Sequence, residues 1–191
     1  MKSFVAILLA CFLSAGAGVA PTSRAALPSL VDLSGVERHP LDVSGKLGAV
    51  IVFVRTDCPI SNAYAPEFRR LVEGYSSKGV SFYLVYAVKD LPVAEAREHA
   101  KQYGFNCPAM IDRQHALVKA LGATVTPEAF VVGADGRIVY RGRIDDLFVG
   151  LGRQKHVATT HELRDAVEAV AAGKDPGVTR TKAVGCAISD D

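Results

Sequence analysis

The chain has 191 residues, of which 49% are hydrophobic and 22% are charged, values typical of a globular protein and not of a disordered one. This length suffices for one domain whose core does not depend on disulfides. The formal net charge of +2 excludes the basic excess that attracts nucleic acid or an anionic membrane surface, so we expect neither as a partner.

The N-terminus has the pattern of an export signal. Lys2 precedes an apolar run over residues 4–12, and small residues follow it. The run is too short to span a membrane. We therefore expect residues 1–25 to be a signal peptide, no stable membrane insertion after its removal, and a periplasmic or secreted protein. Cys11 ends a lipoprotein-like box, so a lipid anchor through this cysteine is the alternative.

Hydrophobic periodicity and turn residues predict alternating strands and helices. The expected elements are a hairpin over 27–47, a buried strand over 49–54, a helix over 59–77, a strand over 80–88, a helix over 93–103, a short strand over 108–111, a helix over 112–121, a hairpin of strands 129–132 and 137–141, a loop over 142–158, and a helix over about 159–172. This order predicts an α/β fold with a mixed central sheet and helices on both faces. Residues 26–172 would form one domain, followed by a tail over 173–191.

Local signals support particular element ends. Ser34-Gly35 and Asp135-Gly136 are turn sequences. Asp112 is expected to cap the helix that follows it, and Thr159 with Glu162 has the spacing of a capping box for the last helix.

Cys58 directly follows the buried strand and begins the helix over 59–77. In open α/β sheets the functional crevice lies at this end of the strands. Free N–H groups and the helix dipole favour a thiolate there, which is the nucleophilic form. The alternative is a cysteine that packs as a small hydrophobe. We expect Cys58 to be the reactive thiol.

Two further thiols accompany Cys58 in the exported chain, Cys107 and Cys186. Three thiols allow one disulfide at most, which argues against a purely structural disulfide framework in an oxidising compartment.

The motif CPISNAYAP over residues 58–66 resembles the active-site helix of the thioredoxin-like superfamily, with Pro66 at the place of its kinking proline. Thr126-Pro127 resembles the cis-proline loop of that family, which faces the reactive cysteine and receives the partner chain. The resemblance covers about residues 27–172 and is closest to the redoxin or TlpA-like, AhpC/TSA-related exported branch. It implies a thioredoxin fold, thiol–disulfide chemistry at Cys58, and partner binding at Thr126, Pro127 and Pro59.

Two departures from the family pattern concern catalysis. Ser61 stands at the place of the second cysteine, giving a CxxS site; its hydroxyl can donate a hydrogen bond to a thiolate but cannot resolve a mixed disulfide. Asp57 replaces the usual tryptophan before the nucleophile. Its carboxylate would raise the thiol pKa, accept the thiol proton, or cap the helix, and we favour the cap.

The sequence leaves the resolving thiol open. If the short strand after Cys107 runs parallel to the first strand, Cys107 lies at the far end of the sheet from Cys58, and bridging needs Cα atoms within about 7 Å. Cys186 follows the last helix by fourteen residues, and an extended tail of that length reaches roughly 46 Å. Geometry favours Cys186 over Cys107, whose alternative role is core packing.

The expected function is that of an exported thiol–disulfide oxidoreductase acting on a disulfide-bearing or thiol protein. A thiol peroxidase acting on peroxide is the alternative, although Arg55 and Ile51 stand where peroxiredoxins have a threonine and a proline. We expect Arg55 to be a solvated strand-end charge. A third hypothesis is a non-catalytic binding or metallochaperone module.

We assign no catalytic or metal-binding site to the histidines or to the charged segment 141–146. The five histidines show no metal-ligand spacing, so we expect no metal ion and no cofactor. The charged residues of segment 141–146 are expected to form a solvated ion-pair network.

The export signal makes a direct prediction. Exported protein should begin between about residues 18 and 26, because small-x-small cleavage boxes end there. N-terminal sequencing measures this directly. Exported protein that still begins at Met1 would contradict the signal peptide, and a lipid on Cys11 would replace it by an anchor.

Overall fold

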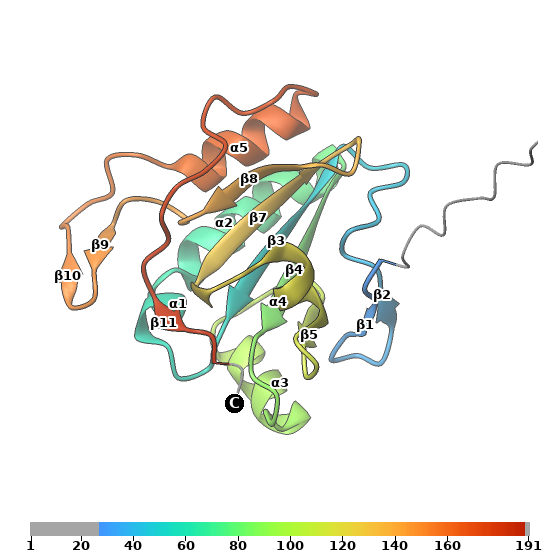
Figure 1. Ribbon diagram of the computed structural model, residues 1–191, viewed down its shortest axis with the longest axis vertical. Helices are drawn as coiled ribbons and strands as arrows, with labels where there is room; N and C mark the ends of the chain where they lie inside the picture. The colour runs from blue at the N-terminus through green and yellow to red at the C-terminus, as the bar shows by residue number, and fades with distance from the viewer. Residues whose placement is uncertain (1–26, 190–191) are drawn as a thin grey trace, which may run out of the picture.

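The computed structural model describes residues 27–189, so the expected signal peptide and Cys11 lie outside the described residues. The centre is a five-stranded sheet in the order β5–β4–β3–β7–β8 (Figure 1). Its strands are β3 (Gly48–Val54), β4 (Val80–Tyr86), β5 (Ala109–Ile111), β7 (Glu128–Gly133) and β8 (Ile138–Gly142). β3, β4 and β5 are mutually parallel, whereas β7 is antiparallel to both β3 and β8, which confirms the expected mixed sheet.

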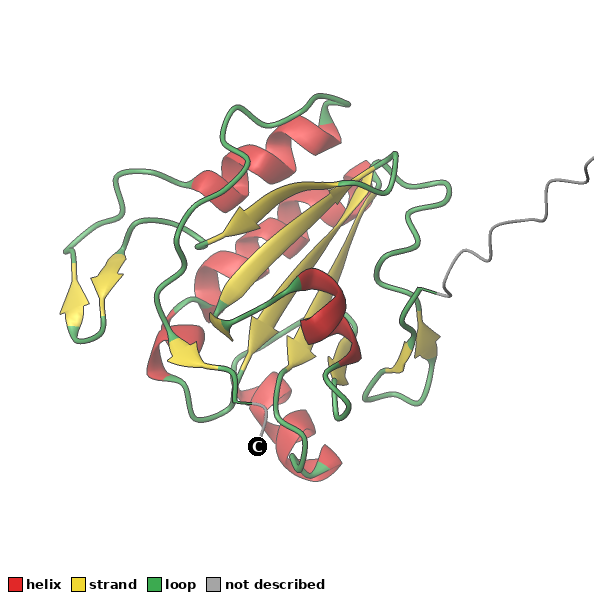
Figure 2. Ribbon diagram, in the orientation of Figure 1, coloured by secondary structure: helices red, strands yellow, loops and turns green. Residues whose placement is uncertain are grey.

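β3 is the middle of the core, and each of its seven residues is buried. Val50 and Val52 face one hydrophobic cluster, and Ile51 and Phe53 face the other. The first cluster contains residues of α2 (Ala65–Tyr75) and α5 (Glu162–Ala171), and the second contains residues of α4 (Ala116–Leu121). Helices therefore cover both faces of the sheet (Figure 2), which explains why β3 is a continuous apolar run.

The helix expected over 59–77 is not continuous. It consists of α1 (Pro59–Ala63), a break at Tyr64, α2, and a 3₁₀ turn η1 (Ser76–Lys78). The single-helix prediction was wrong here because Pro66 has no N–H, and its ring excludes the carbonyl of the preceding turn. The Tyr64 hydroxyl holds the break by donating a 2.6 Å hydrogen bond to Asp145.

Asp145 and Asp146 are buried, so the expected solvated network over 141–146 was also wrong. The Asp146 carboxylate accepts hydrogen bonds from the backbone N–H groups of Thr159 and Thr160. It also accepts a hydrogen bond from the Thr159 hydroxyl. Thr159 therefore does not form the expected capping box, and α5 begins without a side-chain cap.

Other local signals gave the right result. The N-terminal hairpin is β1 (Leu30–Val31) and β2 (Glu37–Arg38), and α3 (Val93–Gln102) fills most of the range expected for it. The Asp112 carboxylate accepts hydrogen bonds from the backbone N–H groups of Ala116 and Val118 in α4, but the helix expected over 112–121 begins only at Ala116 and its N-cap residue is His115.

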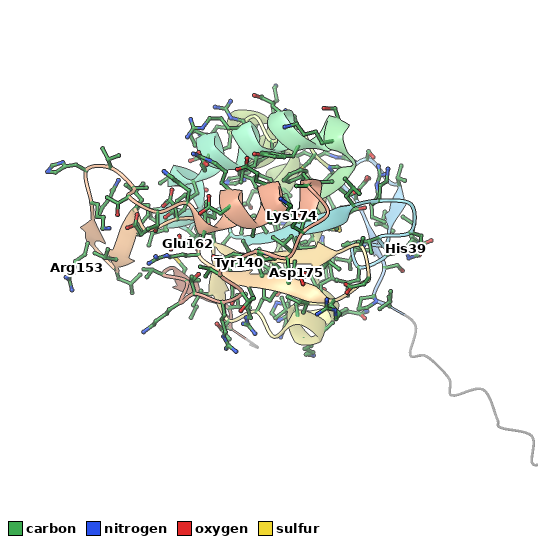
Figure 3. The ribbon with its side chains drawn as sticks, turned by 90° about the horizontal axis from the view of Figure 1, so that it is seen from above. His39, Tyr140, Arg153, Glu162, Lys174 and Asp175 are labelled. Atoms are coloured by element: carbon green, nitrogen blue, oxygen red, sulfur yellow. The ribbon has the colours of Figure 1, made fainter. Side chains whose placement is uncertain are left out.

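Four short strands lie in regions that were expected to be loop or tail. β9 (Phe148–Gly150) and β10 (Arg153–Gln154) form a hairpin that projects from the body, with Arg153 far from the sheet (Figure 3). β6 (Val125–Thr126) and β11 (Cys186–Ala187) pair antiparallel, which joins the C-terminal tail to the loop before β7.

The tail is fixed to the body before it reaches β11. The Arg141 N–H donates to the Thr179 carbonyl, and the Thr181 N–H donates to the Arg141 carbonyl, so the tail continues the sheet beyond β8. Figure 1 shows the tail running past β8 and down to β11, beside α1. Among residues 27–189, no helix is long and apolar enough to cross a membrane.

The Phe53–Phe130 contact joins β3 to β7 in an edge-to-face arrangement with ring centroids 5.7 Å apart. Phe130 is fully buried, so Phe130→Ala should lower the free energy of unfolding by about 3–5 kcal/mol through lost burial and a cavity. Ile138→Ala, at an exposed position of β8, is the matched control and should cost about 0.5 kcal/mol or less. Urea unfolding of both variants measures the difference; equal losses would contradict the placement of Phe130 in the core.

Candidate active site

The antiparallel pairing of β3 with β7 brings Cys58 to the cis-proline loop. Phe53 near the end of β3 pairs with Glu128 at the start of β7. Cys58, which follows β3, and Thr126, which precedes β7, therefore meet at the same end of these two strands. The Cys58 S–H donates a 3.1 Å hydrogen bond to the Thr126 carbonyl. The Thr126–Pro127 peptide bond is cis, which confirms that expectation.

β11 adds Cys186 to the same place. Cys186 pairs with Thr126 across the two short strands, and its Sγ lies 2.6 Å from the Sγ of Cys58. Both residues are free thiols in this structure, with the Cys186 S–H directed at the Cys58 sulfur. The structure thus brings together two of the three cysteines among the described residues.

Cys107 is separated from this pair by the sheet itself. It precedes β5, which lies two strands away from β3, or about 10 Å at the usual strand spacing. That separation exceeds the reach of a disulfide of about 7 Å between Cα atoms. Burial raises the pKa of the Cys107 thiol to about 12, which suits a packed and unreactive cysteine.

The two neighbouring sulfurs have opposite acidities. Burial alone would raise the pKa of Cys58, but hydrogen bonds from Cys186 and Ser61 outweigh it and hold the pKa below its usual value. Burial, the hydrogen bond to Cys58 and the negative charge on Cys58 raise the pKa of Cys186 to about 11. Cys58 is therefore the sulfur that ionises first.

Ser61 supplies a further donor to a Cys58 thiolate. Its hydroxyl is buried and makes no well-formed hydrogen bond to any residue in the range 27–189. It nevertheless lies close enough to Cys58 to lower the pKa of that thiol. Because the hydroxyl is uncommitted, it can turn to the sulfur when Cys58 loses its proton. The dipole of α1 contributes less than the sequence suggested, because α1 has only five residues.

Asp57 pairs with Arg55 and does not cap α1. Both carboxylate oxygens accept from the Arg55 guanidinium at 3.0 Å, and the N-cap residue is Cys58, which makes no side-chain cap. The favoured interpretation of Asp57 as a cap was therefore wrong. The hydrogen bond from Arg55 outweighs burial and holds the pKa of Asp57 below its usual value.

Arg55 was expected to be a solvated charge, but it reaches the tail. Besides pairing with Asp57, its guanidinium donates a 3.3 Å hydrogen bond to the Ala187 carbonyl, one residue beyond Cys186. The sequence gave no signal for this contact because 132 residues separate the two partners.

The sequence also gave no signal for a chain of hydrogen bonds that joins Asn62, His99 and Tyr86. The Asn62 amide donates to the Thr56 carbonyl at 3.0 Å, and its oxygen lies 2.9 Å from Nε2 of the buried His99. Nδ1 of His99 lies 2.9 Å from the Tyr86 hydroxyl. Because the Asn62 oxygen can only accept, Nε2 of His99 carries the ring proton. Neutral His99 therefore donates a hydrogen bond to Asn62 and accepts one from Tyr86. Burial lowers the pKa of His99 and favours that neutral form.

The expected partner-binding residues differ in exposure. Pro59 is exposed, whereas Thr126 and Pro127 are buried. The tail covers the loop closely at Gly185, where an added Cβ would collide with the Thr126 carbonyl.

These features define a thioredoxin-fold protein with a two-thiol site at the cis-proline loop. The sequence profile of the Redoxin family matches residues 22–147, and the chain belongs to that family.

Relatives and solved structures agree with this assignment. The chain is 28% identical over 109 residues to the thiol–disulfide oxidoreductase ResA of Geobacillus thermodenitrificans; the match covers 57% of this chain and 61% of that protein, so it spans about three fifths of the relative's length. A hypothetical protein from Sinorhizobium meliloti 1021 superposes with a TM-score of 0.74 at 26% identity, covering 86% of this chain and 91% of that one. A secreted Mycobacterium tuberculosis disulfide oxidoreductase, with a TM-score of 0.52, 18% identity, and coverage of 76% of this chain and 95% of that one, shares the fold.

The hydrogen bond from Cys186 predicts a measurable shift in acidity. Cys186→Ala should raise the pKa of Cys58, because the thiolate loses its donor, so Cys58 should ionise at higher pH than in the wild type. Cys107→Ala should leave it unchanged. The ultraviolet absorbance of the thiolate, followed across pH in each reduced variant, measures the shift. A Cys58 pKa that does not move in Cys186→Ala would contradict the contact between the sulfurs.

Proposed function

We propose that this protein is an exported thiol–disulfide oxidoreductase in which Cys58 is the nucleophile and Cys186 is the resolving thiol. The observation that supports this most strongly is the 2.6 Å approach of the two sulfurs beside the cis-proline loop. The similarity to thiol–disulfide oxidoreductases supports the same reaction class.

In the proposed reaction, the Cys58 thiolate attacks one sulfur of a partner disulfide when β11 leaves β6. A Cys58–partner disulfide forms, and the other partner sulfur leaves as a thiolate. Cys186 then loses its proton and attacks the Cys58 sulfur. The Cys58–Cys186 disulfide forms and the partner leaves as a dithiol, so the partner is reduced by two electrons and the protein is oxidised by two.

Each neighbouring residue has a role in this reaction. Ser61 donates to the Cys58 thiolate, and the Arg55–Asp57 pair holds the tail through the Ala187 carbonyl. Thr126 and Pro127 receive the partner chain after β11 has left, and the exposed Pro59 contacts it at the rim. Asp57 is engaged by Arg55, so we assign it to tail binding rather than to proton transfer.

The proposal predicts distinct outcomes for four substitutions. Cys58→Ser should abolish reduction of a disulfide substrate such as insulin, and Ser61→Ala should lower it only modestly. Cys186→Ser should leave a mixed disulfide trapped on Cys58, because the resolving thiol is missing. Cys107→Ser should cost mainly stability through lost packing.

Mass spectrometry of the oxidised wild type identifies the linkage directly. A Cys58–Cys186 link is the expected result. A Cys58–Cys107 link would overturn the choice of resolving thiol alone. Rapid oxidation of Cys58 by peroxide without any insulin reduction would indicate a thiol peroxidase instead. If the protein shows neither activity but retains a bound metal, the metallochaperone hypothesis would replace the proposal.

A further inference from the structure

The two sulfurs of the site differ sharply in their access to solvent. Cys58 is 0% exposed, whereas Cys186 is only partly buried. This difference bears on how the oxidised protein, with its proposed Cys58–Cys186 disulfide, is returned to the reduced form. The inference therefore rests on the proposed function.

Close packing of the tail enforces the burial of Cys58. The tail is bonded to the edge of β8 at Arg141 and to β6 at Thr126. Both contacts depend on glycine: a Cβ at Gly142 would collide with Thr181, and a Cβ at Gly185 would collide with the Thr126 carbonyl. A disulfide to Cys186 would tether the tail in this position, because the tail carries one of its two sulfurs.

We propose that a reducing dithiol protein attacks the oxidised site at Cys186 and not at Cys58, so that the partner becomes linked to the tail. The attacking thiolate forms a bond to the Cys186 sulfur, the Cys58–Cys186 bond breaks, and its electron pair leaves on Cys58. This reverses the expectation from the family resemblance, in which the cysteine that begins the active-site helix carries the partner.

The acidities of the two thiols favour the same direction of attack. In thiol–disulfide exchange the thiol of lower pKa leaves faster. Attack at Cys186 expels Cys58 as a thiolate that keeps its hydrogen-bond donor Ser61. Attack at Cys58 would expel Cys186, whose pKa burial raises.

The second thiol of the partner completes the exchange. After losing its proton, it attacks the partner sulfur of the mixed disulfide and releases Cys186, which takes up a proton. The partner leaves as a disulfide, having lost two electrons, and Cys58 and Cys186 are again free thiols. One monothiol molecule can carry out only the first step, and a second molecule must attack to release Cys186, so the adduct at the earliest times marks the sulfur that is attacked.

The test uses oxidised wild-type protein and glutathione as that monothiol. Short reactions are stopped with acid, and peptide mass spectrometry measures the glutathione adduct on each cysteine, extrapolated to zero time. We expect at least about tenfold more adduct on Cys186 than on Cys58. An equal or larger initial adduct on Cys58 would overturn the inference. Absence of a Cys58–Cys186 disulfide in the starting protein would instead overturn the proposed function.

Two glycine variants test whether the tail is the cause. Gly185→Val should loosen β11 and lower the Cys186-to-Cys58 adduct ratio severalfold, because Cys58 becomes accessible. Gly177→Val is the matched control: it lies in the same tail, an added Cβ there meets no atom within 4 Å, and its ratio should equal that of the wild type. A ratio unchanged in Gly185→Val would contradict shielding by the tail.

Discussion

The antiparallel pairing of β11 with β6 is the interaction on which the site depends. Each strand has only two residues, yet the register places Cys186 opposite Thr126, and the Thr126 carbonyl in turn holds Cys58. A slip of one residue would turn the Cys186 side chain to the other face of the pair. The bonds between Arg141 and residues 179 and 181 reduce the cost of this closure, because only a short segment then remains free before Cys186.

The placement of the second thiol on a tail changes what the site can do. In a CxxC site both thiols lie on one helix turn, whereas here Ser61 occupies that turn and the second thiol arrives from a separate segment. Closing the longer loop costs conformational entropy, and in the proposed reaction the tail leaves the cis-proline loop so that the partner can reach it. The same arrangement divides the chemistry between a buried sulfur of lowered pKa and a partly exposed sulfur of raised pKa.

The sequence predicted the parts of the site that depend on local patterns. The apolar run of β3 fixed the strand, Cys58 followed it, and Thr126-Pro127 preceded the next strand. The break at Tyr64 was also foreseeable, because Pro66 cannot continue a helix without strain. The contacts of Arg55 with the tail and of His99 with Asn62 could not be predicted, because they join segments far apart in the chain. Thr159 failed as part of a capping box because Asp146, thirteen residues earlier in the preceding loop, binds it instead.

Hydrogen exchange of the fully reduced wild-type protein tests most directly whether the tail is docked before any disulfide forms. The Ile188 N–H donates a 3.0 Å hydrogen bond to the Thr124 carbonyl and reports on the β11–β6 pairing. The account predicts that this amide exchanges at least about tenfold more slowly than in an unstructured chain. Exchange at the unstructured rate, with the amides of β3 still protected, would show that the tail is undocked in the reduced protein and would contradict the account.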